Sequence, residues 1–242
     1  RIRGDILTRR ELQIAAILEE GLDRPGEHLT FSPGGSKRDS WTKRLDSGRS
    51  KALLRVRREL TERAAILRHH RVLVYGADDG LLVWESARRA PEGMVAGLCR
   101  TEEGRAALGK YAESLDELDR PALATLGTDG AADANPFGVS FDRILARDPA
   151  STLEGLVDLA RALARFAAPH GRAVVSARVP SGGMLLTDLV PAEQSGALAE
   201  AERAFYADGS NPLFAWNGET LRTALAAAGF SAACETIRCS EP

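Results

Sequence analysis

From Arg71 onward, short apolar runs alternate with longer segments of helical periodicity, and this alternation limits the possible folds most. The apolar runs cover residues 71–76, 94–98, 122–126, 141–146 and 172–179. Helical patterns fill 81–89, 102–118 and 151–168 between them. Continuous apolar runs are typical of strands that are buried on both faces of a parallel sheet. Because helices separate these strands, the sequence predicts an α/β fold in which a mostly parallel sheet lies between two helical layers.

The last part of the pattern is less regular. Helical periodicity returns over 192–206 and 219–228, where Gly229 supplies the glycine that commonly ends a helix. A final apolar stretch over 230–239 predicts one more strand. No further strand follows it before Pro242, so this edge strand would lack a neighbour. We therefore expect the chain to be cut at its carboxyl end or to pair with another segment.

The charge distribution separates the beginning of the chain from the rest. Residues 1–71 hold 17 Lys+Arg and 10 Asp+Glu, whereas the remaining residues hold 15 and 24. Helical periodicity covers 8–22 and about 39–68, on either side of a Gly/Pro-rich loop. The sequence thus predicts a basic, N-terminal helical extension over residues 1–68 and an acidic α/β domain over 69–242.

The basic extension has two interpretations. Its basic residues crowd into one stretch: Lys37, Lys43, Arg44, Arg49, Lys51, Arg55, Arg57, Arg58, Arg63, Arg68 and Arg71. Such a surface could neutralise the phosphates of a nucleic acid. Alternatively it is a solvated helix with internal ion pairs, because Glu59 and Arg63 are four residues apart.

Several classes of protein do not match the composition. The three cysteines (Cys99, Cys234 and Cys239) and four histidines lack the spacing of a zinc site or a disulfide framework. No run of about 18 apolar residues predicts a membrane-spanning helix. The start of the chain, which is Arg1, shows no signal-peptide pattern. We therefore expect a cytoplasmic protein without a metal site, or a fragment of a longer cytoplasmic protein.

The turn after the first predicted strand is the clearest candidate site. Gly76 and Gly80 flank Ala77, Asp78 and Asp79 between that strand and a helix. Glycine allows positive φ and close approach of a ligand to the backbone, and the helix end offers free N–H groups. In parallel sheets ligands bind beyond the carboxyl ends of the strands, where the strand order reverses. This rule adds Cys99 and the Arg147–Asp148 pair to the candidate site.

The order of these segments resembles the class I S-adenosylmethionine-dependent methyltransferases over about residues 65–240. The segment Gly76-Ala-Asp-Asp-Gly80 is similar to the glycine-rich loop of that family. Val95 to Glu103 is similar to its second strand and following helix, Phe141 to Pro149 to its fourth strand, and Glu219 to Phe230 to its late helix. The resemblance implies a Rossmann-like methyltransferase fold, S-adenosylmethionine as cofactor, and cofactor contacts from Gly76, Ala77, Asp78, Asp79, Gly80, Cys99, Arg147 and Asp148.

The same resemblance shows three departures at one place. Val74 stands where the family has an acidic residue in the first strand, and Asp78 replaces the central glycine of the loop. Cys99 replaces the carboxylate that accepts hydrogen bonds from the ribose hydroxyls, and a thiol is a weak acceptor. Asp79 contacts the ligand, or it is a solvated turn residue or a cap of the next helix.

Two functional hypotheses follow. One is a methyltransferase with an unknown acceptor, in which Asp148 either acts as a base or orients the acceptor; Asp148 could equally cap the next helix. The other is a binding or scaffolding module that lost the cofactor site. The segment Leu7 to Ala16 and the order of domains also resemble the carboxyl-terminal domain fused to RarA-type recombination ATPases, which implies a module of a larger bacterial DNA replication or recombination ATPase.

Overall fold

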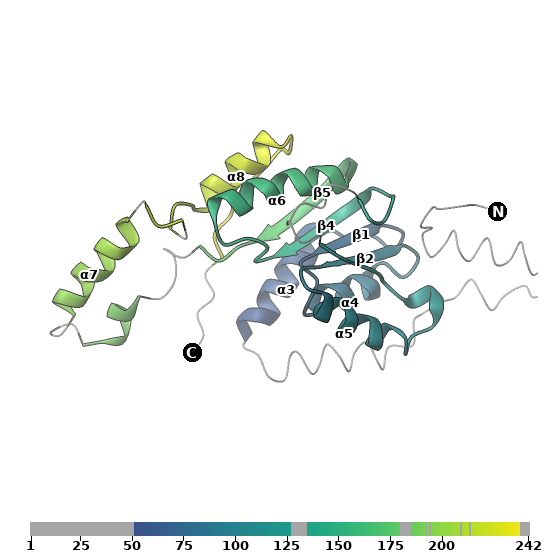
Figure 1. The fold of residues 1–242 in the computed structure, drawn as a ribbon, viewed down its shortest axis with the longest axis horizontal. Helices are drawn as coiled ribbons and strands as arrows, with labels where there is room; N and C mark the ends of the chain where they lie inside the picture. Colours follow the sequence, from purple (N-terminus) through teal and green to yellow (C-terminus); the bar gives the residue numbers. More distant parts are fainter. Residues whose placement is uncertain are drawn as a thin grey trace, which may run out of the picture. The chain divides into compact units, whose positions relative to one another are not determined.

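The computed structural model describes residues 51–126, 135–179 and 185–237, except for residues 192, 194, 209 and 213. These residues belong to two compact units. The first unit contains the described residues up to Arg147 together with 165–175. The second contains 148–164 and the described residues from Ser176 onward. Figure 1 shows both units and labels most of their helices and strands.

A five-stranded sheet forms the centre of the first unit. Its strands are β1 (Arg71–Tyr75), β2 (Met94–Cys99), β3 (Ala122–Thr125), β4 (Phe141–Arg147) and β5 (Ala167–Ser176), in the spatial order β3-β2-β1-β4-β5. The pairs β1–β2, β1–β4 and β2–β3 are all parallel, with Val72 opposite both Val95 and Arg143. This order confirms the predicted Rossmann-like sheet of the methyltransferase fold.

Three helices of the first unit cover one face of this sheet. They are α3 (Lys51–Ala64), α4 (Leu81–Arg89) and α5 (Glu102–Ala112), and a 3₁₀ turn, η1 (Glu117–Asp119), follows α5. Helix α3 packs against α4 and β4, whereas α4 packs on β1 and β2. The domain boundary expected near residue 68 stays a prediction, although the structure groups the described part of α3 with the sheet.

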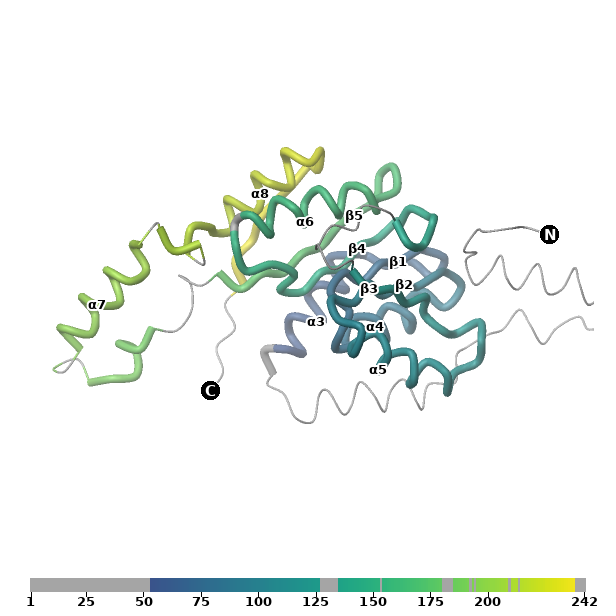
Figure 2. The backbone as a smooth tube through the Cα atoms, viewed as in Figure 1, coloured from purple at the N-terminus to yellow at the C-terminus, as the bar shows by residue number. Residues whose placement is uncertain are grey.

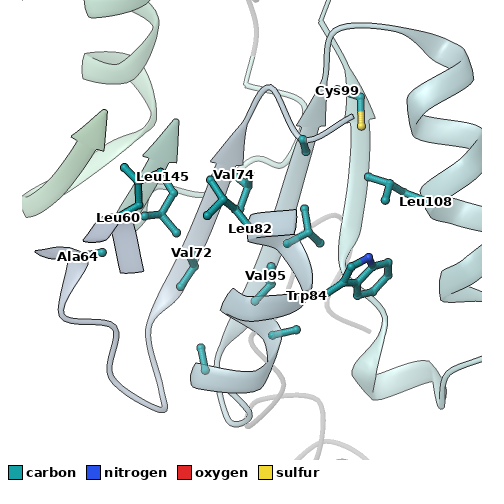
Figure 3. Close-up of a cluster of buried hydrophobic side chains, with 14 of the residues drawn as sticks. Leu60, Ala64, Val72, Val74, Leu82, Trp84, Val95, Cys99, Leu108 and Leu145 are labelled. Atoms are coloured by element: carbon teal, nitrogen blue, oxygen red, sulfur yellow. The ribbon is translucent and has the colours of Figure 1, made fainter. Parts of the chain in front are cut away.

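A continuous apolar cluster joins these helices to the strands. Leu60 and Ala64 come from α3, Val72 and Val74 from β1, and Trp84 from α4, and all five are at most 3% exposed. Figure 3 shows their side chains meeting those of β2, α5 and β4. Burial of a Val- or Leu-sized side chain stabilises a fold by about 1.5–3 kcal/mol. This cluster therefore fixes the strands whose carboxyl ends form the candidate site.

The second unit is mainly helical. It contains most of α6 (Leu153–Phe166), the 3₁₀ turn η3 (Leu186–Leu189), α7 (Gly196–Ala207) and α8 (Gly218–Ala227), whose course Figure 2 traces. The carboxylate of Glu202 in α7 accepts hydrogen bonds from the backbone amides of Leu186 and Thr187 and so holds η3. The indole of Trp216 donates to the carbonyl of Ser151 at 2.9 Å.

The strand predicted over residues 230–239 is wrong for the part that the structure describes. Residues 230–237 form neither strand nor helix, and most of their side chains are exposed. A lone edge segment with no buried face gains too little from packing to hold an extended conformation. Among the described residues, no helix is long and apolar enough to cross a membrane.

Candidate ligand-binding site at the carboxyl edge of the sheet

The turn between β1 and α4 has the backbone conformation that its glycines predict. Gly76 has φ +74° and Gly80 has φ +68°, a region that other residues enter only with strain. The amides of Gly76 and Ala77 both donate to the carbonyl of Leu98, at 2.9 and 3.0 Å, which ties the turn to the end of β2. Gly80 precedes the first residue of α4, and the carboxylate of Asp79 accepts from the amide of Leu81 at 3.0 Å.

This turn lies where the strand order reverses. Strands β2 and β3 follow β1 to one side of it, whereas β4 and β5 lie on its other side. Ligands of parallel sheets bind at such a switch point, beyond the carboxyl ends of the strands. The fold thus places residues 76–80 at the expected binding edge, which we call the carboxyl edge.

Asp78 does not point freely toward a ligand, because its carboxylate is engaged by the β2–α5 turn. It accepts hydrogen bonds from the amides of Arg100 (3.0 Å) and Thr101 (2.9 Å) and from the Thr101 hydroxyl (3.0 Å). The guanidinium Nε of Arg100 completes an ion pair at 3.3 Å. Partial burial opposes ionisation, but these hydrogen bonds outweigh it and lower the pKa of Asp78.

Helix α5 is built around this carboxylate. Thr101 caps α5 by accepting from the amide of Gly104 at 3.1 Å. A Cβ on Gly104 would lie 2.7 Å from Asp78 Oδ1, so the glycine is what lets the first turn of α5 approach so closely. Asp78 therefore fixes the start of α5 against the glycine turn.

Asp79 bridges the switch point in the other direction. Its carboxylate forms an ion pair with Arg147 at the end of β4, while also capping α4 through Leu81. The two side chains are 29% and 21% exposed, so this pair is partly sheltered from water. The structure thus brings together the predicted site residues Asp79 and Arg147, and their charged groups pair with each other.

A third carboxylate lies at the start of α5. Glu102 accepts from the Thr125 hydroxyl at 2.7 Å, at the end of β3, and forms an ion pair with Arg105. The hydrogen bonds from Arg105 and Thr125 lower the pKa of Glu102 to about 2. Its side chain is 60% exposed, so Glu102 is the most accessible of the three carboxylates at this edge.

Cys99, at the end of β2, faces the interior. Its side chain is fully buried in the apolar cluster together with Trp84 and Leu108 (Figure 3). Burial, reinforced by the nearby charge of Asp78, raises the pKa of the thiol to about 12. The thiol therefore stays protonated and takes no direct part in the polar network.

Asp148 belongs to the second unit, whereas Arg147 belongs to the first. Its carboxylate accepts from the backbone amide of Arg178 at 3.0 Å and forms an ion pair with the Arg178 guanidinium at 3.1 Å. Its own backbone lies at φ +45°. Thr152, rather than Asp148, caps the start of α6, because its hydroxyl accepts a hydrogen bond from the amide of Gly155 at 3.2 Å.

The structure also shows residues that the sequence patterns did not single out. Arg100, Thr101, Glu102 and Thr125 make most of the polar contacts at the carboxyl edge. Their sequence signal is position: Arg100, Thr101 and Glu102 follow the strand predicted over 94–98 within four residues, and Thr125 lies near the end of the strand predicted over 122–126. The last two residues of each predicted strand and the four residues that follow it include all four of these positions.

Comparison with known proteins identifies structural likeness alone. No protein-family profile matches the chain. No curated protein matches it by sequence. Among solved structures, protein BH2331 of Bacillus halodurans C-125 is 17% identical, with a TM-score of 0.45 over 72% of this chain and 68% of that one.

Two other solved structures cover about half of this chain. Precorrin-6y C5,15-methyltransferase of Geobacter metallireducens GS-15 is 17% identical over 50% of this chain, with a TM-score of 0.39. Coclaurine N-methyltransferase, solved with N-methylheliamine and SAH, is 16% identical over 50%, with a TM-score of 0.42. This chain spans 60% and 35% of their respective lengths. The methyltransferase-like fold therefore rests on the strand order and register described above.

Proposed function

We propose that the first unit binds S-adenosylmethionine, or its product S-adenosylhomocysteine, at the carboxyl edge, and that the chain is a methyltransferase-like domain. One observation carries the proposal: the turn with positive φ at Gly76 and Gly80 lies at the switch point of a β3-β2-β1-β4-β5 sheet. When bound, the cofactor supplies an activated methyl group. The protein contributes mainly by orienting donor and acceptor.

The backbone of the turn fits such a ligand better than the side chains around it do. The guanidinium Nε of Arg100 lies 3.7 Å from the place that a Cβ on Gly76 would take, so this side chain covers the glycine. Arg100 is nevertheless 48% exposed and can turn toward solvent without crossing the core. Glu102, exposed and close to the ends of β2 and β3, is the residue best placed to accept from ribose hydroxyls in place of Cys99.

Binding of S-adenosylhomocysteine tests the proposal in the wild type and in Arg100→Ala. A ligand at 100 times its dissociation constant stabilises the native state by about 2.7 kcal/mol, so a rise in unfolding midpoint is expected. Arg100→Ala should bind more tightly, because no guanidinium has to be displaced, and Glu102→Gln should bind more weakly. Arg161→Ala, which breaks an exposed ion pair with Asp158 in the second unit, is the matched control. No shift in either the wild type or Arg100→Ala would contradict the proposal.

A second candidate is a binding or scaffolding module that keeps the fold without the cofactor. The observation that favours it is the Asp78 carboxylate, which accepts hydrogen bonds from the β2–α5 turn and forms an ion pair with Arg100 there. Such a module could belong to a larger recombination ATPase of the RarA type, the resemblance carried by residues 7–16, which lie outside the described residues. A lack of S-adenosylhomocysteine binding in both the wild type and Arg100→Ala would support this candidate.

A further inference from the structure

Toward the opposite edge of the same sheet, where β1 and β4 begin, two arginines lie on neighbouring strands. Arg143 lies on β4 and Arg172 on β5, and these strands are adjacent. Leu145 belongs to the apolar cluster and Val174 packs against it. Because side chains alternate along a strand, Arg143 and Arg172, two residues before each, lie on that same face. We call this region the amino edge.

Each of the two guanidinium groups donates to a backbone carbonyl, and one buried donor of Arg143 has no acceptor among the described residues. Arg143 donates through one terminal nitrogen to the carbonyl of Asp142 at 2.7 Å. Its Nε atom is buried and has no hydrogen-bond partner among the described residues. Arg172 donates to the carbonyl of Arg63, in the last turn of α3, at 2.9 Å. Buried donors in native proteins are nearly always paired, so an unpaired one calls for a missing acceptor.

The charges around Arg143 do not cancel. Burial, and then the positive charge of Arg172, lower the pKa of Arg143, whereas the carboxylate of Asp142 opposes them. Asp142 itself is engaged, because it accepts from the amide of Arg71 at 2.8 Å. The nearby His70 does not offset the positive charge of the two arginines. Burial and the charge of Arg143 lower the pKa of His70, and its Nδ1 accepts a hydrogen bond from the amide of Leu67.

We propose that Arg143 and Arg172 form a phosphate-binding site at the amino edge. A phosphate offers an acceptor to Arg143 Nε, which has none among the described residues, and its charge relieves the repulsion between the two guanidinium groups. Arginine suits this role because its planar N–H groups match phosphate oxygens in pairs. Arg172 is exposed, so a ligand can reach the pair from solvent.

The adjoining sequence favours the same kind of ligand. Residues 51–71, which comprise α3 and the start of β1, contain seven Lys+Arg and two Asp+Glu. Both acids pair within α3, Glu59 with Arg63 and Glu62 with Arg58. These pairs confirm the intrahelical pairing expected from the sequence. The segment keeps an excess of positive charge and adjoins the proposed site through the Arg63 carbonyl, to which Arg172 donates. The phosphate could come from a nucleic-acid backbone or from a free phosphate.

Binding of inorganic phosphate tests the site through the unfolding midpoint of the full chain at constant ionic strength. Phosphate should raise the midpoint of the wild type, and Arg143→Gln and Arg172→Gln should each weaken phosphate binding by about 10- to 100-fold. Arg143→Lys keeps the charge but loses Nε–H, so it should also bind more weakly. Arg161→Gln removes an exposed arginine of the second unit and should respond like the wild type.

A short random-sequence DNA duplex then distinguishes the two sources of phosphate. If a nucleic acid is the ligand, Arg143→Gln and Arg172→Gln weaken duplex binding and each reduces its salt dependence by about one phosphate contact. If the ligand is a free phosphate, duplex binding is unchanged while the phosphate response is lost. Phosphate also stabilises proteins generally, without binding at a site. An equal rise in midpoint for wild type, Arg143→Gln and Arg172→Gln would therefore overturn the proposal.

Discussion

Charged side chains are paired differently at the two edges of the sheet. At the carboxyl edge, each of Asp78, Asp79 and Glu102 has an arginine partner. At the amino edge, Arg143 has a buried Nε without an acceptor among the described residues, beside a second arginine. The carboxylates named at the carboxyl edge, where ligands of parallel sheets bind, are thus paired within the protein. The amino edge keeps a buried donor that has no acceptor among the described residues.

This contrast separates stability from binding. A carboxylate that accepts several backbone amides holds its surroundings together, and a ligand must compete with those bonds. A partly buried guanidinium whose Nε has no acceptor contributes little to folding through that atom, and a ligand that supplies an acceptor gains an interaction that the protein does not already make. We therefore expect changes at the carboxyl edge to reduce stability and changes at the amino edge to reduce binding.

The largest expected effect concerns Cys99, which tests how closed the carboxyl edge is. A rise in its pKa from 9.0 to about 12 leaves roughly 1000-fold less thiolate at neutral pH. Iodoacetamide should therefore modify the exposed Cys234 and spare Cys99 in the native protein. Peptide mass spectrometry measures both sites, and unfolding in urea should abolish the difference. Equal rates in the native state would show that the edge opens.

Asp78→Ala should produce the largest loss of stability at the carboxyl edge. It removes the acceptor of two backbone amides and of the Thr101 hydroxyl at the start of α5. We expect a loss of about 2–3 kcal/mol in the free energy of unfolding, measured by urea denaturation. Asp158→Ala, which breaks an exposed pair with Arg161, should cost less than about 0.5 kcal/mol.

Acid should remove the contribution of Asp78 without mutation. Its pKa in the folded state lies below the value of 3.8 expected in the unfolded chain. The stabilisation is then fully present above that unfolded value and is lost as the pH falls through the folded pKa. Asp78→Asn should therefore show a shallower decline of stability with acid than the wild type. Parallel curves would indicate that the carboxylate is not held as described.

The fold could be predicted from the sequence because strands that are buried in a sheet appear in the sequence as continuous apolar runs. The runs that start at Arg71, Met94, Ala122 and Phe141 became β1 to β4 within one residue of their expected ends. The glycine turn was also predictable, since positive φ at Gly76 and Gly80 restricts the choice of residue. The pattern of apolar residues and the backbone conformation of a turn depend on residues close together in the chain, so both can be predicted from the sequence.

Side-chain partnerships were not predictable for the opposite reason. Asp78 and Arg100 are 22 residues apart, and Asp79 and Arg147 are 68 apart, so only the strand order brings them together. The neighbouring positions of Arg143 and Arg172 depend equally on the pairing of β4 with β5. The strand predicted over residues 230–239 is wrong for residues 230–237, whose apolar pattern resembles a strand although no strand of the described residues pairs with them.

Gly76→Ala tests the backbone of the carboxyl edge apart from its charges. A Cβ at this position meets only ordinary contacts with Arg100, at 3.7 Å, so steric overlap adds little. The cost comes from placing alanine at φ +74°, which we expect to reduce stability by about 1–2 kcal/mol. Gly109→Ala, in α5 with open space around it, should be neutral or slightly stabilising. Equal effects of the two substitutions would show that the turn relaxes to negative φ.

The smallest expected effect has the opposite sign. Arg143→Met keeps the length of the side chain and removes a partly buried charge that Arg172 repels, at the loss of one hydrogen bond to the Asp142 carbonyl. We expect a gain of up to about 1 kcal/mol in stability, measured by urea denaturation without phosphate. In millimolar phosphate the order should reverse, because the wild type gains stability from the anion and the variant does not. A variant less stable than the wild type under both conditions would mean that Arg143 is held by bonds within the protein, and the contrast between the two edges would disappear.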